Sequence, residues 1–276
     1  MQLLSLLFGA LVGLSLGLTG GGGAIFAVPL LTYALGVAPR QAIGISLVAV
    51  AVTSLVGFIQ RWLKDQVEIR IGAMFAVASM LGVPLGVWLG RQVPDTWLML
   101  LFSLLMLSIS ARMWRQAGRA ISDVPVRLLG HDPKAALLDG PSCRRDAQGR
   151  LLLTTRCARM LALVGIFTGI LSGMFGIGGG FIIVPSLMFA SNMSLLRAVG
   201  TSLMVICLTS SVGLASELWA GQNLPLLSTS LFVVGGLMGM SLGLASAHRI
   251  PAPTLQRAFS IIILIVATLV ILRNIL

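Results

Sequence analysis

Acidic side chains are scarce in this chain and almost absent from its hydrophobic parts. The 276 residues include only 8 Asp and Glu. None occurs among the first 59 residues, and from Ala147 onward the only one is Glu217. Proton and sodium relays usually place carboxylates or histidines inside membrane spans. The sequence therefore shows no pattern from which a coupling ion can be inferred.

Cysteine and histidine are equally sparse. The three cysteines form no CxxC pair, which argues against a disulfide framework and a zinc site. His131 falls in a polar stretch and His248 in a loop between apolar runs. The run GLSLG at 13–17 has the G-x-S-x-G spacing of a hydrolase nucleophile, but it lies inside an apolar helix with no base nearby. We therefore expect no catalytic residue, no metal, no cofactor and no enzymatic activity.

Apolar residues make up most of what is present. They account for 57% of the chain, charged residues for 10%, and the mean hydropathy is +1.01. These values indicate an all-α polytopic membrane protein whose main partner is the lipid bilayer. Ten apolar segments are separated by short breaks, and a span needs about 20 helical residues. The segments 24–35 and 181–190 are too short to span.

Positive charge is concentrated in one place. Ten of the 19 Lys and Arg residues lie between Arg112 and Arg159, around the one long polar stretch. This distribution is typical of the positive-inside rule, so we attribute the net charge of +11 to membrane topology and expect no nucleic-acid partner. We assign 114–155 as a polar, basic cytoplasmic linker between two membrane regions.

The chain also repeats itself. A shift of 156 residues aligns GLTGGGGAIFAVPLL with GMFGIGGGFIIVPSL, and the register continues into the next segment. The shift pairs Gly20 with Gly176, Pro29 with Pro185 and Ser46 with Ser202. We therefore predict an internal duplication, with a first transmembrane repeat at 1–113 and a second at 156–276. In each half, a glycine-broken or re-entrant first helix precedes about three spanning helices.

The relative orientation of the halves depends on whether the first segments span. Four spans per half would make the halves parallel, whereas a re-entrant first hairpin would leave three and invert them. Outside the linker, the inverted arrangement puts six Lys and Arg inside and three outside, and the parallel arrangement puts four inside and five outside. The positive-inside rule thus favours an inverted repeat, and the parallel one stays open.

Both glycine loops precede a short helix, and this geometry suits an anion. The first turn of a helix carries unpaired N–H groups and the positive end of its dipole. Interrupted helices at matching positions of two repeats are the best sequence indicator of a transporter's binding site. Hydroxyls nearby can add hydrogen bonds to an oxyanion without placing a charge in the membrane. We predict a substrate site formed by the two glycine loops, these hydroxyls and two arginines: Gly20, Gly21, Gly22, Gly23, Gly176, Gly178, Gly179, Gly180, Ser46, Thr201, Ser202, Arg40 and Arg197.

A simpler interpretation exists for several of these residues. Small and hydroxyl side chains also let membrane helices approach closely. Arg40 and Arg197 stand just before the second helix of each half, where an arginine can instead extend to the membrane interface. Only for the glycine loops is a role in the substrate site clearly favoured over these simpler interpretations.

The doubled pattern resembles the TauE/SafE sulfite exporter family, also called the toluene sulfonate uptake permeases. The resemblance rests on GLTGGGGAIFAVPLL followed by RQAIGISLVAV, and on GIGGGFIIVPSLMF followed by LLRAVGTSLMVI. It implies a secondary carrier in the bacterial inner membrane that moves small sulfur-containing anions such as sulfite or organosulfonates, often outward, and is compatible with a homodimer. Two rival interpretations remain open: an anion channel built on the same site, and a membrane assembly factor or sensor that acts through the linker.

Overall fold

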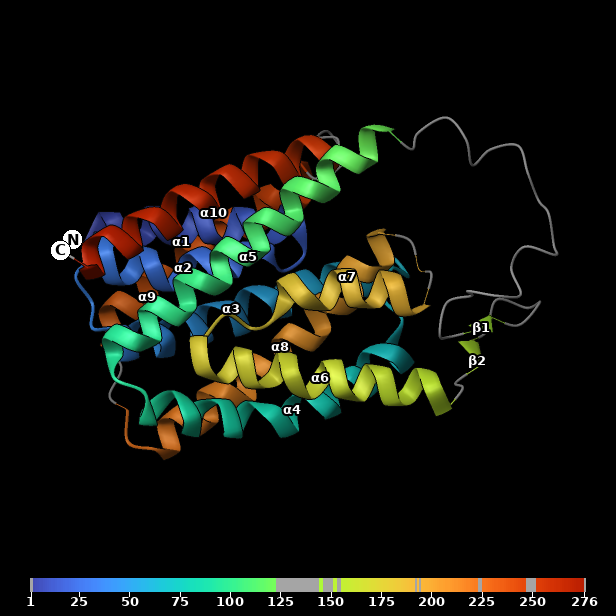
Figure 1. The fold of residues 1–276 in the computed structure, drawn as a ribbon, viewed down its shortest axis with the longest axis horizontal. Helices are drawn as coiled ribbons and strands as arrows, with labels where there is room; N and C mark the ends of the chain where they lie inside the picture. Colours follow the sequence, from blue (N-terminus) through green and yellow to red (C-terminus); the bar gives the residue numbers. More distant parts are fainter. Residues whose placement is uncertain are drawn as a thin grey trace.

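The chain folds into a bundle of helices that lie roughly side by side along the long axis of the molecule (Figure 1). A computed structural model describes residues 2–122, 144–145, 151–152, 155–191, 193, 195–222, 225–246 and 252–275. Most of the predicted linker lies outside these ranges. Of that stretch, the structure gives the flanking helical ends and a short antiparallel pair of strands, β1 (Arg144–Arg145) and β2 (Leu151–Leu152).

The helices follow the predicted segments closely. The first half contains α1 (Gln2–Thr19), a short helical segment, α3 (Pro39–Trp62), α4 (Ile69–Gln92) and α5 (Asp95–Ser122). The short segment winds first as a 3-10 helix, η1 (Gly22–Phe26), then as α2 (Ala27–Pro29), and finally as a π-helix, η2 (Leu30–Ala34). The second half contains α6 (Thr155–Phe175), α7 (Gly180–Ser191), α8 (Leu195–Trp219), α9 (Leu226–Ser246) and α10 (Ala252–Ile275). Helix α5 continues to Ser122, past Met113, where its hydrophobic run ends.

Five of the described helices are long and apolar enough to cross a membrane. They are Pro39–Trp62, Ile69–Gln92, Ala158–Phe175, Leu196–Trp219 and Leu226–Ser246. The apolar parts of α1, the short segment 22–34, α5 and α10 are shorter. The predicted class, an all-helical polytopic membrane protein, is confirmed.

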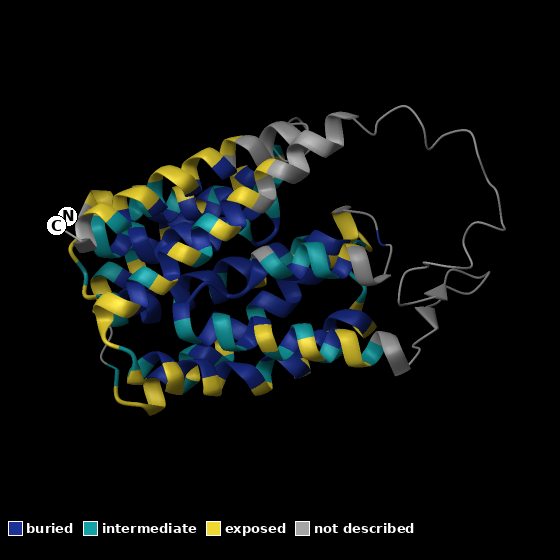
Figure 2. Cartoon of the chain, in the orientation of Figure 1, coloured by how far each residue is buried: buried dark blue, intermediate teal, exposed yellow. Residues whose placement is uncertain are grey.

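Large apolar side chains cover the outside of the bundle, as a protein surrounded by lipid requires. Figure 2 shows exposed residues along the outer faces of the helices and buried ones between them. The exposed set includes Leu81 and Trp88 on α4, Leu104 on α5 and Leu269 on α10. In water such a surface would aggregate, whereas in a bilayer it faces hydrocarbon.

Two pairs of helices pack through glycines at very short range. A Cβ atom added at Gly13 of α1 would lie 1.9 Å from the carbonyl oxygen of Gly236 on α9. A Cβ added at Gly169 of α6 would lie 2.1 Å from the carbonyl oxygen of Ser79 on α4. Because backbone meets backbone along both contacts, α1–α9 and α4–α6 are two tightly packed helix pairs. In each pair the two helices run in the same direction, since contacts advance together along both sequences.

The central helices α3 and α8 run in opposite directions. Gly57, late in α3, lies near Leu203, early in α8, whereas Gly213, late in α8, lies near Leu47, early in α3. Helix α3 is parallel to α9, because Gly236 meets Thr53 and Met240 meets Gly57. Since α1 is also parallel to α9, α1 and α3 point the same way. The segment between them therefore returns the chain toward the end at which α1 begins.

The second half shows the same relation. Helix α4 is parallel to α8, because Gly72 lies near Met204 and Gly213 lies near Val83. Since α6 is parallel to α4, α6 and α8 also point the same way, and α7 lies on the returning stretch between them. Helices α5 and α10 pack against each other, and the hydroxyl of Ser110 on α5 donates to the carbonyl oxygen of Ser260 on α10 at 2.8 Å.

Candidate functional site

The first glycine loop ends α1 and starts the short helical segment. The amide of Gly20 donates to the carbonyl oxygen of Leu16 at 2.8 Å, which closes the last turn of α1. Gly20 then has a φ of 72° and Gly21 a φ of 154°, backbone conformations that residues with a Cβ rarely adopt. Winding restarts at Gly22, and Gly23 is packed so tightly against α1 that a Cβ there would lie 2.4 Å from the amide nitrogen of Leu16.

The second loop is built in the same way. The amide of Gly176 donates to the carbonyl oxygen of Ser172 at 2.8 Å, and α6 ends at Phe175. Gly176, Gly178 and Gly179 have φ values of 68°, 69° and 71°. Helix α7 then begins at Gly180. The prediction that each loop precedes a short helix is confirmed.

The two loops touch each other in the interior of the bundle. A Cβ added at Gly21 would lie 2.6 Å from the Cα of Gly180, and one added at Gly180 would lie 2.5 Å from the Cα of Gly21. Glycine is required on both sides of this contact, because each Cβ would overlap backbone atoms that cannot rotate away. The N-terminal ends of two short helices, 22–34 and α7, consequently meet at one point, and their dipoles present positive ends there.

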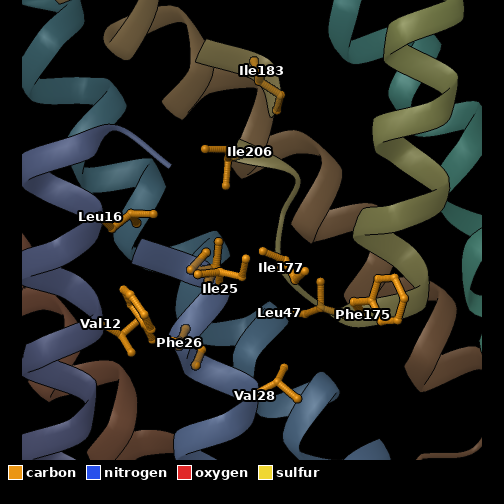
Figure 3. Packing of buried hydrophobic residues seen from close by; sticks show 14 of the residues in the cluster. Val12, Leu16, Ile25, Phe26, Val28, Leu47, Phe175, Ile177, Ile183 and Ile206 are labelled. Carbon is orange, nitrogen blue, oxygen red and sulfur yellow. The ribbon is translucent and has the colours of Figure 1, made fainter. Parts of the chain in front are cut away.

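Buried apolar side chains surround this meeting point. Figure 3 shows Ile25 of the first short segment, Ile177 of the second loop and Ile206 of α8 within one cluster. Ile25, Ile177 and Ile206 are each 0% exposed. Electrostatic interactions are stronger in such a setting than at a protein surface, because little water screens them.

Two predicted site hydroxyls hold the loops from opposite sides. The hydroxyl of Ser46 on α3 donates to the carbonyl oxygen of Gly176 in the second loop. The hydroxyl of Ser202 on α8 donates to the carbonyl oxygen of Gly20 in the first loop, at 2.6 Å. Each serine thus anchors the loop of the other half, and each is 0% exposed. The hydroxyl of Ser202 also lies 2.8 Å from the carbonyl oxygen of Val199, so its proton is shared between two acceptors. In this arrangement both serines position the loops.

Two buried hydroxyls near the second loop are left without a partner in the described part of the chain, that of Ser172 in the last turn of α6 and that of Ser210. Ser210 on α8 is fully buried, and its Oγ has no hydrogen-bond partner among the described atoms. It lies 3.0 Å from the position that a Cβ of Gly178 would occupy. A buried hydroxyl normally finds a partner, because leaving it unpaired costs about 1–3 kcal/mol. Ser210 stands in a Thr-Ser pair that aligns with Thr53 and Ser54 of the first half, which is the signal that marks it in the sequence.

The remaining predicted site residues lie away from the loop contact. The hydroxyl oxygen of Thr201 accepts a hydrogen bond from the amide of Glu68 at 2.9 Å, in the turn after α3. A guanidinium nitrogen of Arg197 lies 3.5 Å from a carboxylate oxygen of the same Glu68. At the opposite end of α3, the Nε of Arg40 donates to Asp95 at 2.9 Å. The two predicted arginines therefore lie at opposite ends of the bundle, each beside a carboxylate that the sequence alone did not connect to it.

A third ion pair involves residues that were not predicted for the site. Arg91 at the end of α4 contacts Glu217 on α8 at 3.0 Å, and Glu217 is only 7% exposed. The repeat does not reproduce this pair, because Glu217 aligns with Arg61 and Arg91 aligns with His248. Their pairing could not be inferred from sequence spacing, because it depends on how α4 packs against α8. Among the described residues, no group of three or more His, Cys, Asp and Glu side chains is placed to hold a metal ion.

The five membrane-length helices and the exposed apolar surface are those of a multi-pass membrane protein. The sequence profile of the Sulfite exporter TauE/SafE family matches residues 5–270. The chain belongs to this family, as its motifs indicated.

Relatives with assigned names agree with the family. A probable membrane transporter protein of Xylella fastidiosa is 38% identical over 271 residues, which cover 96% of this chain and 93% of the relative. The probable membrane transporter protein YdhB of Bacillus subtilis is 31% identical over 196 residues, 71% of this chain and 70% of the relative. The Sulfite exporter TauE/SafE family protein 6 of Arabidopsis thaliana is 34% identical over 116 residues, 42% of this chain and 26% of the relative. No solved structure matches the chain.

Proposed function

We propose that the protein is a secondary carrier that moves a small sulfur-containing anion, such as sulfite or an organosulfonate, outward across the bacterial inner membrane. The observation that carries this proposal is the contact of the two glycine loops, where the N-terminal ends of two short helices meet in a buried setting. Amide donors and dipole ends of this kind stabilise negative charge. The name of the family, sulfite exporter, supports sulfur anions as the class of substrate.

The loop residues supply the donors in this proposal, and the hydroxyls arrange them. Amides at Gly21–Gly23 and Gly178–Gly180 would bind the anion's oxygens, and the unpaired hydroxyl of Ser210 would donate one more hydrogen bond. Ser46 and Ser202 would act as positioning residues, because each ties a loop of one half to the central helix of the other. Thr201 would brace the turn after α3. Arg40 and Arg197 would attract anions at the two ends of the pathway.

We also propose that the halves 1–113 and 156–276 are inverted repeats of one ancestral unit. The contacts support this, because each occurs twice with the aligned residues exchanged: Ser46 with Gly176 and Ser202 with Gly20. Helices α3 and α8 occupy equivalent positions and run in opposite directions. The first helix and its returning segment would then form a re-entrant hairpin in each half, facing opposite sides of the membrane.

This arrangement suggests how the carrier alternates its access. The loops touch in the described arrangement, so passage between them is closed. The tightly packed pairs α1–α9 and α4–α6 each join the first helix of one half to a helix of the other half. We propose that these pairs move as rigid units against each other, which opens a path from Gly21 and Gly180 first to one side and then to the other. The end that carries the polar linker would face the cytoplasm.

Flux measurements on purified protein in liposomes test the proposal. Radiolabelled sulfite, thiosulfate, sulfoacetate and a carboxylate of similar size would be offered in separate experiments. We expect saturable uptake of at least one sulfur anion, accelerated by the same unlabelled anion inside the liposome. Transport of the carboxylate alone would refute the sulfur assignment, and an unsaturable conductance would favour a channel.

The linker provides a second discriminating test. Deleting residues 124–149 removes most of the segment through which a sensor or assembly factor would act. We expect the deletion variant to retain flux, because the proposed pathway lies in the helices. Loss of flux with an intact fold would instead indicate that the linker takes part in the function.

A further inference from the structure

A small polar cavity lies between the glycine loops and one end of the bundle. Its lining includes Ile43, three residues before Ser46, and Gly173, three residues before Gly176. Ser46 and Gly176 are the two partners of the hydrogen bond that holds the second loop. Toward the surface the cavity is lined by Arg40, Arg91, Glu217 and Gln222. We call this space the vestibule. Its position places it on the route that an anion would follow between the loops and that end of the molecule.

The vestibule is large enough for a small oxyanion. It offers about 60 Å³ to the centres of water molecules. One water needs roughly 10–15 Å³ by this measure, so the vestibule has room for about four waters or for one ion with three or four oxygens. The cavity at the opposite end, lined by Arg61, Lys64 and Gln66, offers only about 10 Å³.

Arg91 has a buried nitrogen that no group in the described part of the protein pairs with. Its two terminal nitrogens donate to Glu217 at 3.0 Å and to the carbonyl oxygen of Ala220 at 2.9 Å. Its Nε is buried and has no hydrogen-bond partner among the described atoms. Arg40 lies beside it and donates to the carbonyl oxygen of Arg91 at 3.3 Å. Two guanidinium groups that line the same cavity are the kind of donors that planar and tetrahedral oxyanions select.

Glu217 gives the vestibule its particular chemistry. The position aligned with Glu217 is Arg61, and the one aligned with Gln222 is Gln66, so the two ends share the amide but differ in the charged residue. The carboxylate of Glu217 holds Arg91 while the vestibule is empty. An anion that entered would compete with Glu217 for the same guanidinium, which would keep its binding weak and reversible.

We propose that the vestibule is an outer anion subsite in which Arg91 binds a sulfite, sulfate or sulfonate group and Glu217 limits its affinity. That this anion is cargo rests on the proposed function, whereas its binding at Arg91 does not. An ion pair that only joins α4 to α8 would give Arg91 no preference for an incoming anion. The two possibilities therefore differ in a local measurement that requires no transport.

The experiment places a reporter thiol in the vestibule. The full chain carries Gln222→Cys in a background without its own thiols (Cys143→Ser, Cys157→Ser, Cys207→Ala). The labelling rates of two reagents of similar size are compared, the anionic sulfonatoethyl and the cationic trimethylammonioethyl methanethiosulfonate. We expect the anionic reagent to react faster, and sodium sulfate to slow it more than sodium chloride does at equal ionic strength.

Substitutions then distinguish a specific anion site at Arg91 from a general electrostatic attraction of anions to this end of the bundle. The double variant Arg91→Gln and Glu217→Gln removes one charge of each sign, so the net charge does not change. We expect the ratio of anionic to cationic rates to fall about fivefold or more in the double variant and to rise in Glu217→Gln alone. Arg91→Lys keeps the pair with Glu217 but lacks the Nε donor, and we expect a smaller fall. Arg70→Gln, at the exposed start of α4, is the matched control and should leave the ratio unchanged.

The outcomes are separable from those of the flux experiment. A double variant with the wild-type ratio, or a wild-type reporter that reacts faster with the cationic reagent, would overturn the subsite. If Arg91→Gln variants do not fold, an unchanged ratio in Arg91→Lys overturns it as well. If the ratio behaves as expected but no sulfur anion is transported, the proposed function fails and the subsite stands. If flux also proceeds, its KM for sulfite should rise in the double variant while the maximal rate stays within about twofold.

Discussion

The contact between Gly21 and Gly180 leads to the sharpest prediction. In Gly180→Ala, the new methyl carbon would lie 2.5 Å from the Cα of Gly21 and 2.5 Å from the Cδ1 of Ile206. Ile206 can change its rotamer, but the backbone of Gly21 cannot. Ordinary contact needs about 3.5 Å, so the loops must separate by roughly 1 Å. Overpacking of this kind costs about 1–3 kcal/mol, and a displacement of about 1 Å at a binding site can cost a hundredfold in rate.

We therefore expect Gly180→Ala to lower the sulfite flux at least about tenfold and to lower the midpoint of thermal unfolding in detergent. The matched control is Gly22→Ala. Its Cβ would meet only the side chain of Thr19, with the Oγ1 nearest at 3.2 Å, and its φ is not positive. Because alanine keeps the amide donor, the control should transport within about twofold of the wild type. Equal flux in Gly180→Ala and the wild type, or equal losses in both variants, would refute the proposed loop contact.

Three further predictions follow from the packing and the hydrogen bonds. Ser202→Ala leaves the buried carbonyl oxygen of Gly20 without its donor, so thermal unfolding should show a loss of about 1–3 kcal/mol in stability. Ser211 is exposed on the same helix, so Ser211→Ala should lose almost no stability. Gly86→Ala would place a Cβ 2.1 Å from the carbonyl oxygen of Ile170 and should destabilise the α4–α6 pair by about 2–3 kcal/mol. Gly90→Ala, whose Cβ would have its nearest contact at 3.3 Å, should cost less than about 1 kcal/mol. Similar midpoints of thermal unfolding for the two variants would contradict this packing. Ser210→Ala removes an unpaired buried hydroxyl, so the midpoint of thermal unfolding should stay unchanged or rise. The same variant should lower sulfite transport about threefold to tenfold. A variant that is both less stable and fully active would contradict the proposed role of Ser210.

Much of the fold could be predicted from the sequence, because lipid imposes simple rules. The length of the apolar runs identified the membrane helices. The shift of 156 residues aligned the two glycine loops with each other and the two short helices with each other. The glycine loops also marked the place where the structure brings Gly21 and Gly180 together. These signals are local: each depends on the composition of one segment or on its likeness to another.

Other features depend on which helices become neighbours, and the sequence does not encode this directly. The sequence predicted Ser46 and Ser202 for the substrate site, but it did not indicate that their hydroxyls donate to loop carbonyls across the bundle. Arg40 and Arg197 lie beside Asp95 and Glu68, so each has a protein partner at its end of the bundle. The pairing of Arg91 with Glu217 joins residues far apart in the chain. That pairing requires the packing of α4 against α8, which periodicity alone cannot predict.

The position of a bound substrate analogue tests the account most directly. Selenite resembles sulfite in shape and charge, and its selenium can be located by anomalous scattering in crystals of the full chain. We predict a selenium peak within about 4 Å of the amide nitrogens that follow Gly21 and Gly179, with the two loops drawn apart around it. A peak confined to the lipid-facing surface, or bound selenite with Gly21 and Gly180 still in contact and no density between the loops, would contradict it.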